Sequence, residues 1–387
     1  LPVGIKIFQW MNALTLTVLD AASAGSRFLF GRLALAPGVS NAGGEGSLGF
    51  FLAFQALPTI IFFSALMSIL YHLKIMPKII QLFARLFTKL MKVSGAESLC
   101  ATSNIFVGIE SVLTVKPYLK KMTASELCTI LTAGMATVSS NILAVYVFSL
   151  QKVFPNIAGH LISASLLSAP AALAISKILI PESDSPRTLG ENVEIYHEGN
   201  DNLFDAVISG AESGVKIIVG ISALLIAVLG LVELVDTFLG WLGAWVNNLL
   251  SLEGTWSLTA ILKYVFYPFV LFLGVPLSDV GIVAELIGSR LVLTEVTAYV
   301  HLSEYISSGV LTDARSIVIT TYALCGFAHV ASLSIFIGGI SGLIPELRLK
   351  LTKIGFRALI AANLACLMTA CMAGVFYTQN TMLLFTK

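Results

Sequence analysis

The chain has 387 residues, of which 57% are apolar and only 12% are charged, and its formal net charge is +1. Soluble domains carry roughly 25% charged residues, so a soluble protein of this size would have too few charges to cover its surface. The composition therefore excludes a cytosolic globular enzyme, a disordered chain and a nucleic-acid binder. It favours a polytopic membrane protein with one domain of roughly six to ten spans.

The first 49 residues predict a short interfacial helix over 6–20 and then a glycine-rich loop. Residues 50–71 predict the first span, with a kink at Pro58. Residues 74–92 alternate Lys and Arg with Ile, Leu and Phe. That pattern is typical of a basic helix that lies in the cytoplasmic interface of a membrane.

A segment with a central carboxylate follows. Residues 94–121 place Glu110 between two apolar stretches, each of about ten residues, and neither crosses a hydrocarbon layer of ~30 Å alone. A re-entrant helical hairpin, which enters and leaves on the same side, fits better. Residues 125–150 and 156–180 then predict two spans, which complete a first repeat over 50–180.

The second half predicts the same kinds of segment in the same order. These are a polar cytoplasmic loop over 181–205, a span over 206–235, a Trp-rich interfacial region over 237–274, a second re-entrant hairpin over 276–304 and spans over 314–343 and 355–377. The second repeat thus covers 206–377, and residues 378–387 form a C-terminal tail. Basic clusters at 74–92 and 346–357 place both of these segments on the cytoplasmic side.

An internal sequence echo supports the repeat. Residues 133–140 (AGMATVSS) match 325–332 (CGFAHVAS), and Glu110 and Glu295 precede the two segments at comparable distances. A repeat with an odd number of crossings inverts the second unit relative to the first, which is typical of transporters. The predicted fold class is an all-α polytopic membrane protein with inverted repeats, two re-entrant helical hairpins and two broken transmembrane helices. The alternative for the echoed segments is small-residue helix packing.

Glu110 and Glu295 are the first candidate site residues. An ionised carboxylate at membrane depth costs at least ~2.5 kcal/mol, so it persists by pairing, by facing water or by serving a ligand. We expect both to accept hydrogen bonds from a polar solute. His329 is either a site residue or a helix-contact residue. Asn104 and Thr137 offer the oxygen ligands that a hard cation such as Na⁺ prefers.

No Walker loop, G-x-S-x-G or H-E-x-x-H motif occurs, so we expect no enzyme activity and no ATP-driven step within this chain. The five cysteines contain no C-x-x-C pair, which predicts no zinc or redox site and no cofactor. Glu285 and Arg290 are five residues apart, and a structural pair is one interpretation of them, so both are left outside the site.

The segment Asn104-Ile-Phe-Val-Gly108, followed by Glu110, resembles the first hairpin of concentrative nucleoside transporters. Further matching segments are Leu166–Glu182, Gly274–Pro276, Val283–Gly288 and Cys325–Ala328 with Ser332. The resemblance runs in order over about residues 28–375. It implies an ion-coupled symporter, usually Na⁺-driven, that forms a homotrimer.

Carried over residue by residue, the resemblance implies a site for each ligand. The Na⁺ site falls on Asn104, Val107, Thr137 and Val138, the valines acting through their backbone carbonyls. The substrate site falls on the hairpin tip Gly108, Ile109, Glu110 and Ser111, on the ribose-binding carboxylate Glu295, and on Phe327, His329 and Ser332 of the second broken helix.

Three motifs depart from the family pattern. The first tip lacks the usual Gln, Thr294 precedes Glu295 where the family has Asn, and His329 replaces the usual Asn of the second broken helix. Losing the Gln removes a donor and an acceptor for a base edge, and the His adds a group that titrates near neutral pH. Two substrates therefore remain as alternatives: an ordinary nucleoside and a related polar solute.

The resulting prediction is a secondary active transporter that imports nucleosides or a closely related polar solute by cation symport, with Na⁺ as the coupling ion and alternating access as the mechanism. We expect it in the inner membrane of a bacterium, in contact with lipid and with no nucleic-acid partner. The alternatives are H⁺ coupling, a non-transporting nucleoside-recognition or gate protein, and a channel-like structural membrane protein.

Overall fold

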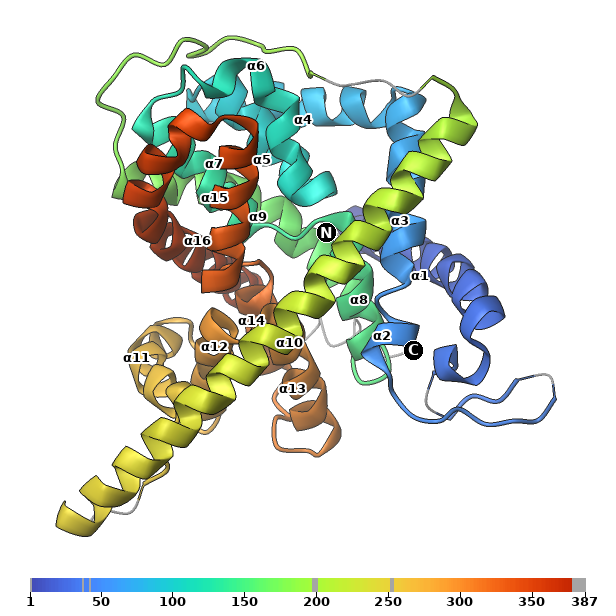
Figure 1. Ribbon diagram of the computed structural model, residues 1–387, viewed down its shortest axis with the longest axis vertical. Coiled ribbons are helices and arrows are strands. Elements are labelled where there is room, and N and C mark those ends of the chain that lie inside the picture. The colour runs from blue at the N-terminus through green and yellow to red at the C-terminus, as the bar shows by residue number, and fades with distance from the viewer. Residues whose placement is uncertain (1, 37, 42, 197–200, 251–253, 378–387) are drawn as a thin grey trace.

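The computed structural model describes residues 2–36, 38–41, 43–196, 201–250 and 254–377, which form helices joined by loops (Figure 1). Four helical segments are long and apolar enough to cross a bilayer: Leu52–His72, Ile157–Leu179, Leu203–Leu249 and Pro345–Phe376. The chain is therefore an all-helical membrane protein with several apolar spans, which confirms this part of the predicted fold class.

The first half of the chain is a series of helices that ends in a long span. In chain order it contains α1 (Pro2–Phe30), η1 (Gly31–Ala34), α2 (Leu52–Gln55), α3 (Thr59–His72), α4 (Ile75–Met91), α5 (Gly95–Val107), η2 (Gly108–Val115), α6 (Lys116–Leu119), α7 (Ala124–Ala136), α8 (Ser140–Leu150) and α9 (Ile157–Leu179). Helix α4 is the basic amphipathic segment, and it buries Met76, Ile80 and Ala84 at helical spacing.

The N-terminal helix is longer than the sequence suggested. The pattern predicts a helix over 6–20, whereas α1 continues to Phe30 and ends where Gly31 adopts a φ of +53°. Helix α1 packs against α3 and α9. Charged and polar side chains interrupt the apolar pattern, so the sequence predicted a shorter helix. The backbone nevertheless stays helical up to the first glycine with left-handed geometry.

The second half begins with the longest helix of the described chain. In order it contains α10 (Leu203–Leu250), α11 (Leu258–Phe272), α12 (Val280–Val292), α13 (Glu295–Ser307), α14 (Ala314–Leu324), α15 (Val330–Leu343), η3 (Pro345–Leu347) and α16 (Arg348–Phe376). Helix α10 crosses the whole molecule diagonally (Figure 1). The span predicted over 206–235 is thus too short: Trp241 and Trp245 lie on α10 rather than in a separate segment. No proline interrupts 203–250, so the helix has no reason to stop earlier.

Two spans expected from the sequence are interrupted by extended backbone. Helices α7 and α8 are separated by residues 137–139, and α14 and α15 are separated by residues 325–329. The two interruptions touch at Gly326. Its φ is +145°, and a Cβ there would lie 2.7 Å from the carbonyl oxygen of Ala136 and 2.7 Å from Sγ of Cys366 on α16. Only glycine therefore fits where the two interrupted helices meet.

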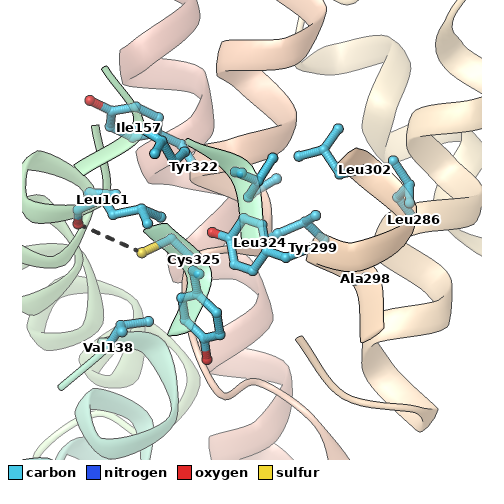
Figure 2. Close-up of a cluster of buried hydrophobic side chains, with 14 of the residues drawn as sticks. Val138, Ile157, Leu161, Leu286, Ala298, Tyr299, Leu302, Tyr322, Leu324 and Cys325 are labelled. Atoms are coloured by element: carbon cyan, nitrogen blue, oxygen red, sulfur yellow. Dashed lines mark hydrogen bonds between the residues drawn. The ribbon is translucent and has the colours of Figure 1, made fainter. Parts of the chain in front are cut away.

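The core lies between the two halves. Figure 2 shows Val138 and Leu161 of the first half on one side of Cys325, with Tyr299 of the second half on the other. The thiol of Cys325 approaches the carbonyl oxygen of Leu161 at 3.9 Å. Helix α16 packs against α7, α9 and α14 and so connects both halves. This packing holds the two interruptions together in the protein interior.

Candidate binding site at the helix interruptions

A cavity of ≈ 450 Å³ lies at the two interruptions. Its wall combines the turn after α5, the interruption before α8, the start of α13, the start of α15 and one face of α10. The lining residues are Val107, Gly108, Glu110, Ser139, Ile142, Ile217, Gly220, Ile221, Leu224, Leu225, Thr294, Glu295, Val296, Phe327, His329, Ser332, Ile335 and Phe336. A volume of this order holds a small polar molecule such as a nucleoside or sugar.

Glu295 is placed by the N-terminus of α13. Thr294 caps that helix by accepting from the backbone N–H of Thr297 at 3.4 Å, and Glu295 is the first helical residue. Its side chain is buried. The hydroxyl of Tyr146, on α8, donates to Oε1 at 2.8 Å. A carboxylate in the first turn also interacts favourably with the helix dipole.

His329 lies opposite, at the start of α15. Its Nδ1 accepts from the backbone N–H of Ser332 at 3.2 Å, which caps the helix. The remaining ring proton is then on Nε2, which lies 2.8 Å from Oε2 of Glu295 and 2.7 Å from Oγ of Ser332. The sequence left His329 between two interpretations, and the structure places it in the cavity next to a carboxylate.

Residues of the predicted hairpin tip lie in two places: at the cavity and in a second polar cluster around Asn104. Gly108 (φ +69°) packs onto Ser139 and lines the cavity together with Glu110. Glu110 is half-buried, and among the described residues it has no hydrogen-bond or ion-pair partner. The side chain of Ile109 lies outside the described part of the structure. Ser111 is not part of the lining: it is buried and donates to Oδ1 of Asn104 at 3.1 Å.

Asn104 is the centre of a neutral polar cluster at the C-terminal end of α7. Its Nδ2 donates to the carbonyl oxygens of Ala133 at 3.1 Å and Gly134 at 3.2 Å, and also to Oγ1 of Thr137. Thr137 in turn donates to the carbonyl oxygen of Ala133 at 2.9 Å. The structure thus brings together two of the predicted cation ligands, with helix C-terminal carbonyls around them.

The two predicted backbone ligands have different surroundings. Val107 lines the cavity, whereas Val138 is fully buried and its carbonyl oxygen accepts from Oγ of Ser165, on α9, at 2.8 Å. A carbonyl oxygen has two lone pairs, so this hydrogen bond fixes its direction and leaves one pair for an ion. In the described residues, no three or more His, Cys, Asp or Glu side chains are grouped so that they could hold a metal ion. A cation at this cluster would therefore rely on neutral oxygens.

Sequence reasoning missed Tyr146, which donates to Glu295 from behind the cavity wall, and several residues that line the cavity. Tyr146 is an aromatic residue inside an apolar span, which carries no distinguishing pattern. Ile217, Ile221 and Leu224 share one face of α10 at helical spacing. That spacing predicts a face, but it does not say whether the face meets lipid or a cavity.

Glu285 and Arg290 do not form the structural pair that the sequence allowed. Lys263 lies 3.0 Å from Glu285, and Tyr305 donates to the same carboxylate at 3.0 Å. Arg290 is fully buried elsewhere. Residues five apart on a helix point about 140° away from each other, so α12 separates the two side chains.

Comparisons with known proteins agree over nearly the whole chain. Residues 160–374 match the family model "Na+ dependent nucleoside transporter C-terminus", and residues 53–153 match the model "Nucleoside recognition". "Solute carrier family 28 member 3" of Mus musculus is 38% identical over 96% of this chain and 52% of its own length. The "Uncharacterized transporter YutK" of Bacillus subtilis is 36% identical over 96% of this chain and 87% of its own length.

Solved structures are also similar to this chain over nearly its whole length. An inward-facing, substrate-bound structure of CNTnw has a TM-score of 0.84 at 33% identity and covers 97% of this chain and 87% of its own. An outward-facing structure of a CNTnw variant has a TM-score of 0.85 at 32% identity. The chain spans about half the length of the first curated relatives it matches. With a family model over more than half of the residues and relatives of this identity, the chain belongs to the concentrative nucleoside transporter family.

Proposed function

We propose that this chain is a cation-coupled nucleoside symporter that works by alternating access. The observation that carries the proposal is the cavity of ≈ 450 Å³, because Glu110, Glu295 and His329 converge in it from three separate elements. Most of its remaining wall is apolar, which suits the faces of a nucleobase. Membership in a family described as Na⁺-dependent supports the coupling.

In this proposal Glu295 receives the ribose hydroxyls and Glu110 receives the base or a second hydroxyl. Glu110 has no partner among the described residues, so it is available to a ligand without losing an existing bond. Glu295 already accepts from Tyr146 and lies beside His329. A ligand hydroxyl must compete with that imidazole, which would tune affinity. Phe327, Ser332 and Gly108 complete the proposed substrate site.

The coupling cation is proposed to bind at Asn104, Thr137 and the carbonyls of Val107 and Val138. At present Nδ2 of Asn104 faces the carbonyls at the end of α7 and its Oδ1 faces Ser111. A half-turn of the amide would exchange the two, and the Ser111 hydroxyl can accept as well as donate. Cation binding would thus switch Asn104 from donor to ligand, next to the turn that carries Glu110.

The finer architecture is part of the same proposal. The segments from α5 to α6 and from α12 to α13 would be re-entrant hairpins, with α7–α8 and α14–α15 as the broken spans of inverted repeats over 50–180 and 206–377. The half-length helices α12 and α13, each of 13 residues, support this because neither can span a bilayer alone. We further propose a homotrimer in a bacterial inner membrane.

Uptake by purified protein in liposomes tests the function. We expect saturable uptake of radiolabelled uridine or adenosine that rises when an inward Na⁺ gradient is imposed, and exchange of internal for external nucleoside in counterflow. Protein whose Tm rises with nucleoside but which does not exchange it would instead be the recognition or gate protein that the match over 53–153 also allows. Ion current without saturable uptake would indicate a channel.

A second candidate is H⁺ coupling, which is favoured by the 2.8 Å approach of His329 to Glu295 inside the cavity. A proton on this pair would take the role of the cation. Uptake with and without Na⁺ between about pH 5.5 and 8 separates the two couplings, because only the H⁺ mechanism retains gradient-driven uptake when Na⁺ is absent.

A further inference from the structure

Arg290, on α12, is a buried charge that pairs with no carboxylate in the described part of the chain. Its side chain is 0% exposed and is among the largest fully buried side chains. Nη2 donates to Oδ1 of Asn363 at 2.5 Å, and Nη1 donates to the carbonyl oxygen of Ala323. Across the described residues, no ion pair joins this guanidinium to a carboxylate.

An Arg side chain cannot avoid the cost of burying a charge by losing its proton, because the guanidinium stays protonated in proteins. A charge in the interior needs compensation of opposite sign, since its desolvation costs several kcal/mol. Here the compensation comes from a helix end. Ala323 lies in the last turn of α14, which ends at Leu324. The carbonyl end of a helix carries roughly half a negative elementary charge, so Arg290 neutralises that terminus.

The first half of the chain contains a corresponding contact. Asn104, on α5, approaches the carbonyls of Ala133 and Gly134 in the last turn of α7. In each half, the helix before the turn that carries a cavity Glu therefore contacts the C-terminal end of the next interrupted helix. The first contact is neutral, whereas the second holds a fixed positive charge.

Arg290 is also connected to the cavity on both sides. Asn363, on α16, donates from Nδ2 to the carbonyl oxygen of Ala328 at 3.1 Å, directly before His329. Arg290 itself precedes Glu295 by five residues. Arg290 and Asn363 together thus link α12, which ends three residues before Glu295, to the segment that carries His329.

We propose that Arg290 is a tethered cation, which takes at the end of α14 the place that the coupling ion takes at the end of α7. It acts as a positioning residue that holds Glu295 opposite His329. The second half then stays assembled without an exchangeable ion, and only the first half responds to Na⁺. The comparison with the coupling ion rests on the proposed function, but the stabilising role of the charge does not.

Thermal stability tests the charge without any need for transport. Arg290→Met keeps much of the volume and removes the charge, Arg290→Lys keeps the charge, and Lys263→Met is the control, which removes a half-exposed charge beside Glu285. A buried charge that is merely tolerated gains stability when an apolar residue replaces it. We expect the opposite order, with Arg290→Met losing about 5 °C or more in Tm, Arg290→Lys losing less and the control changing little. An unchanged or higher Tm for Arg290→Met overturns the proposal.

Transport kinetics test the positioning role. We expect Arg290→Lys to lower the maximal uptake rate about threefold to tenfold while the half-saturating Na⁺ concentration stays within about twofold of wild type. Asn104→Ala should shift the Na⁺ dependence instead. If Arg290→Lys shifts the Na⁺ dependence as strongly as Asn104→Ala does, the separation of the two halves is wrong. If wild-type protein takes up no nucleoside, the proposed function fails, and the Tm series still decides whether Arg290 is a stabilising cation.

Discussion

Nε2 of His329 lies 2.8 Å from Oε2 of Glu295, and the two side chains are only 3% and 5% exposed. Each residue stands at the start of a helix, His329 as the cap of α15 and Glu295 in the first position of α13. Two helix N-termini therefore present one carboxylate and one imidazole to the same cavity, and in the proposed function a polar ligand engages this pair.

Glu295→Gln is expected to reduce nucleoside uptake by about 100-fold or more, because a neutral amide is a weaker acceptor for ligand hydroxyls than a carboxylate. Tyr146 can still donate to the amide oxygen, so the protein should remain folded. Radiolabelled uptake in liposomes measures the loss, and size-exclusion elution with Tm controls for folding. Normal uptake by this variant would show that the binding site lies elsewhere.

His329→Asn is expected to lower the apparent KM for nucleoside about threefold, because Glu295 loses the neighbouring imidazole N–H that competes with the ligand. Asn is also a favourable helix cap, so α15 should still begin at the same place. Initial uptake rates over a range of uridine concentrations give KM and the maximal rate separately. An increase in KM would mean that the imidazole contacts the ligand directly.

Asn104→Ala is expected to raise the half-saturating Na⁺ concentration about tenfold, because it removes a side-chain oxygen ligand. Nucleoside affinity should fall at low Na⁺ and recover at high Na⁺, since the coupling between the two sites is reciprocal. Thr102→Val is the matched control, because among the described residues its hydroxyl donates only to the carbonyl of Ser98, within α5. Equal Na⁺ dependence in Asn104→Ala and wild type would contradict the proposed cation site.

Gly326→Ala is expected to destabilise the protein by about 2–4 kcal/mol, because the new Cβ meets the Ala136 carbonyl and the Cys366 thiol. Gly230→Ala on α10 is the control, since a Cβ there meets no atom within 4 Å. Thermal unfolding in detergent compares the two variants. A Tm of Gly326→Ala equal to that of the control would mean that the interrupted helices are not tightly packed at this point.

Much of the architecture followed from local pattern. Hydrophobic length located the spans that became α9, α10 and α16, and alternating charge identified α4, because both patterns reflect how single elements partition into lipid or the interface. The ends of the helices were predicted less accurately than their positions in the chain. The end of α10 lay beyond the predicted span because a helix continues through moderately polar residues until a breaker appears.

Only part of the candidate site could be predicted from local sequence patterns. Intramembrane carboxylates drew attention to Glu110 and Glu295, since a charge in lipid requires a reason. Residue chemistry also suggested Asn104 and Thr137, and the family resemblance added Val107, Val138 and Phe327. The role of Ser111 as the hydrogen-bond partner of Asn104 and the burial of Arg290 at the end of α14 had no local signature.

The sequence by itself determined that this protein lies in lipid, its helical class, its family and the charged residues that require compensation. Only the tertiary structure decided which groups compensate them: His329 and Tyr146 for Glu295, Lys263 for Glu285, and a helix terminus for Arg290. The physical reason is that hydrophobicity and helix formation are properties of short segments, whereas the stabilisation of a buried charge depends on atoms that the fold brings together from distant parts of the chain.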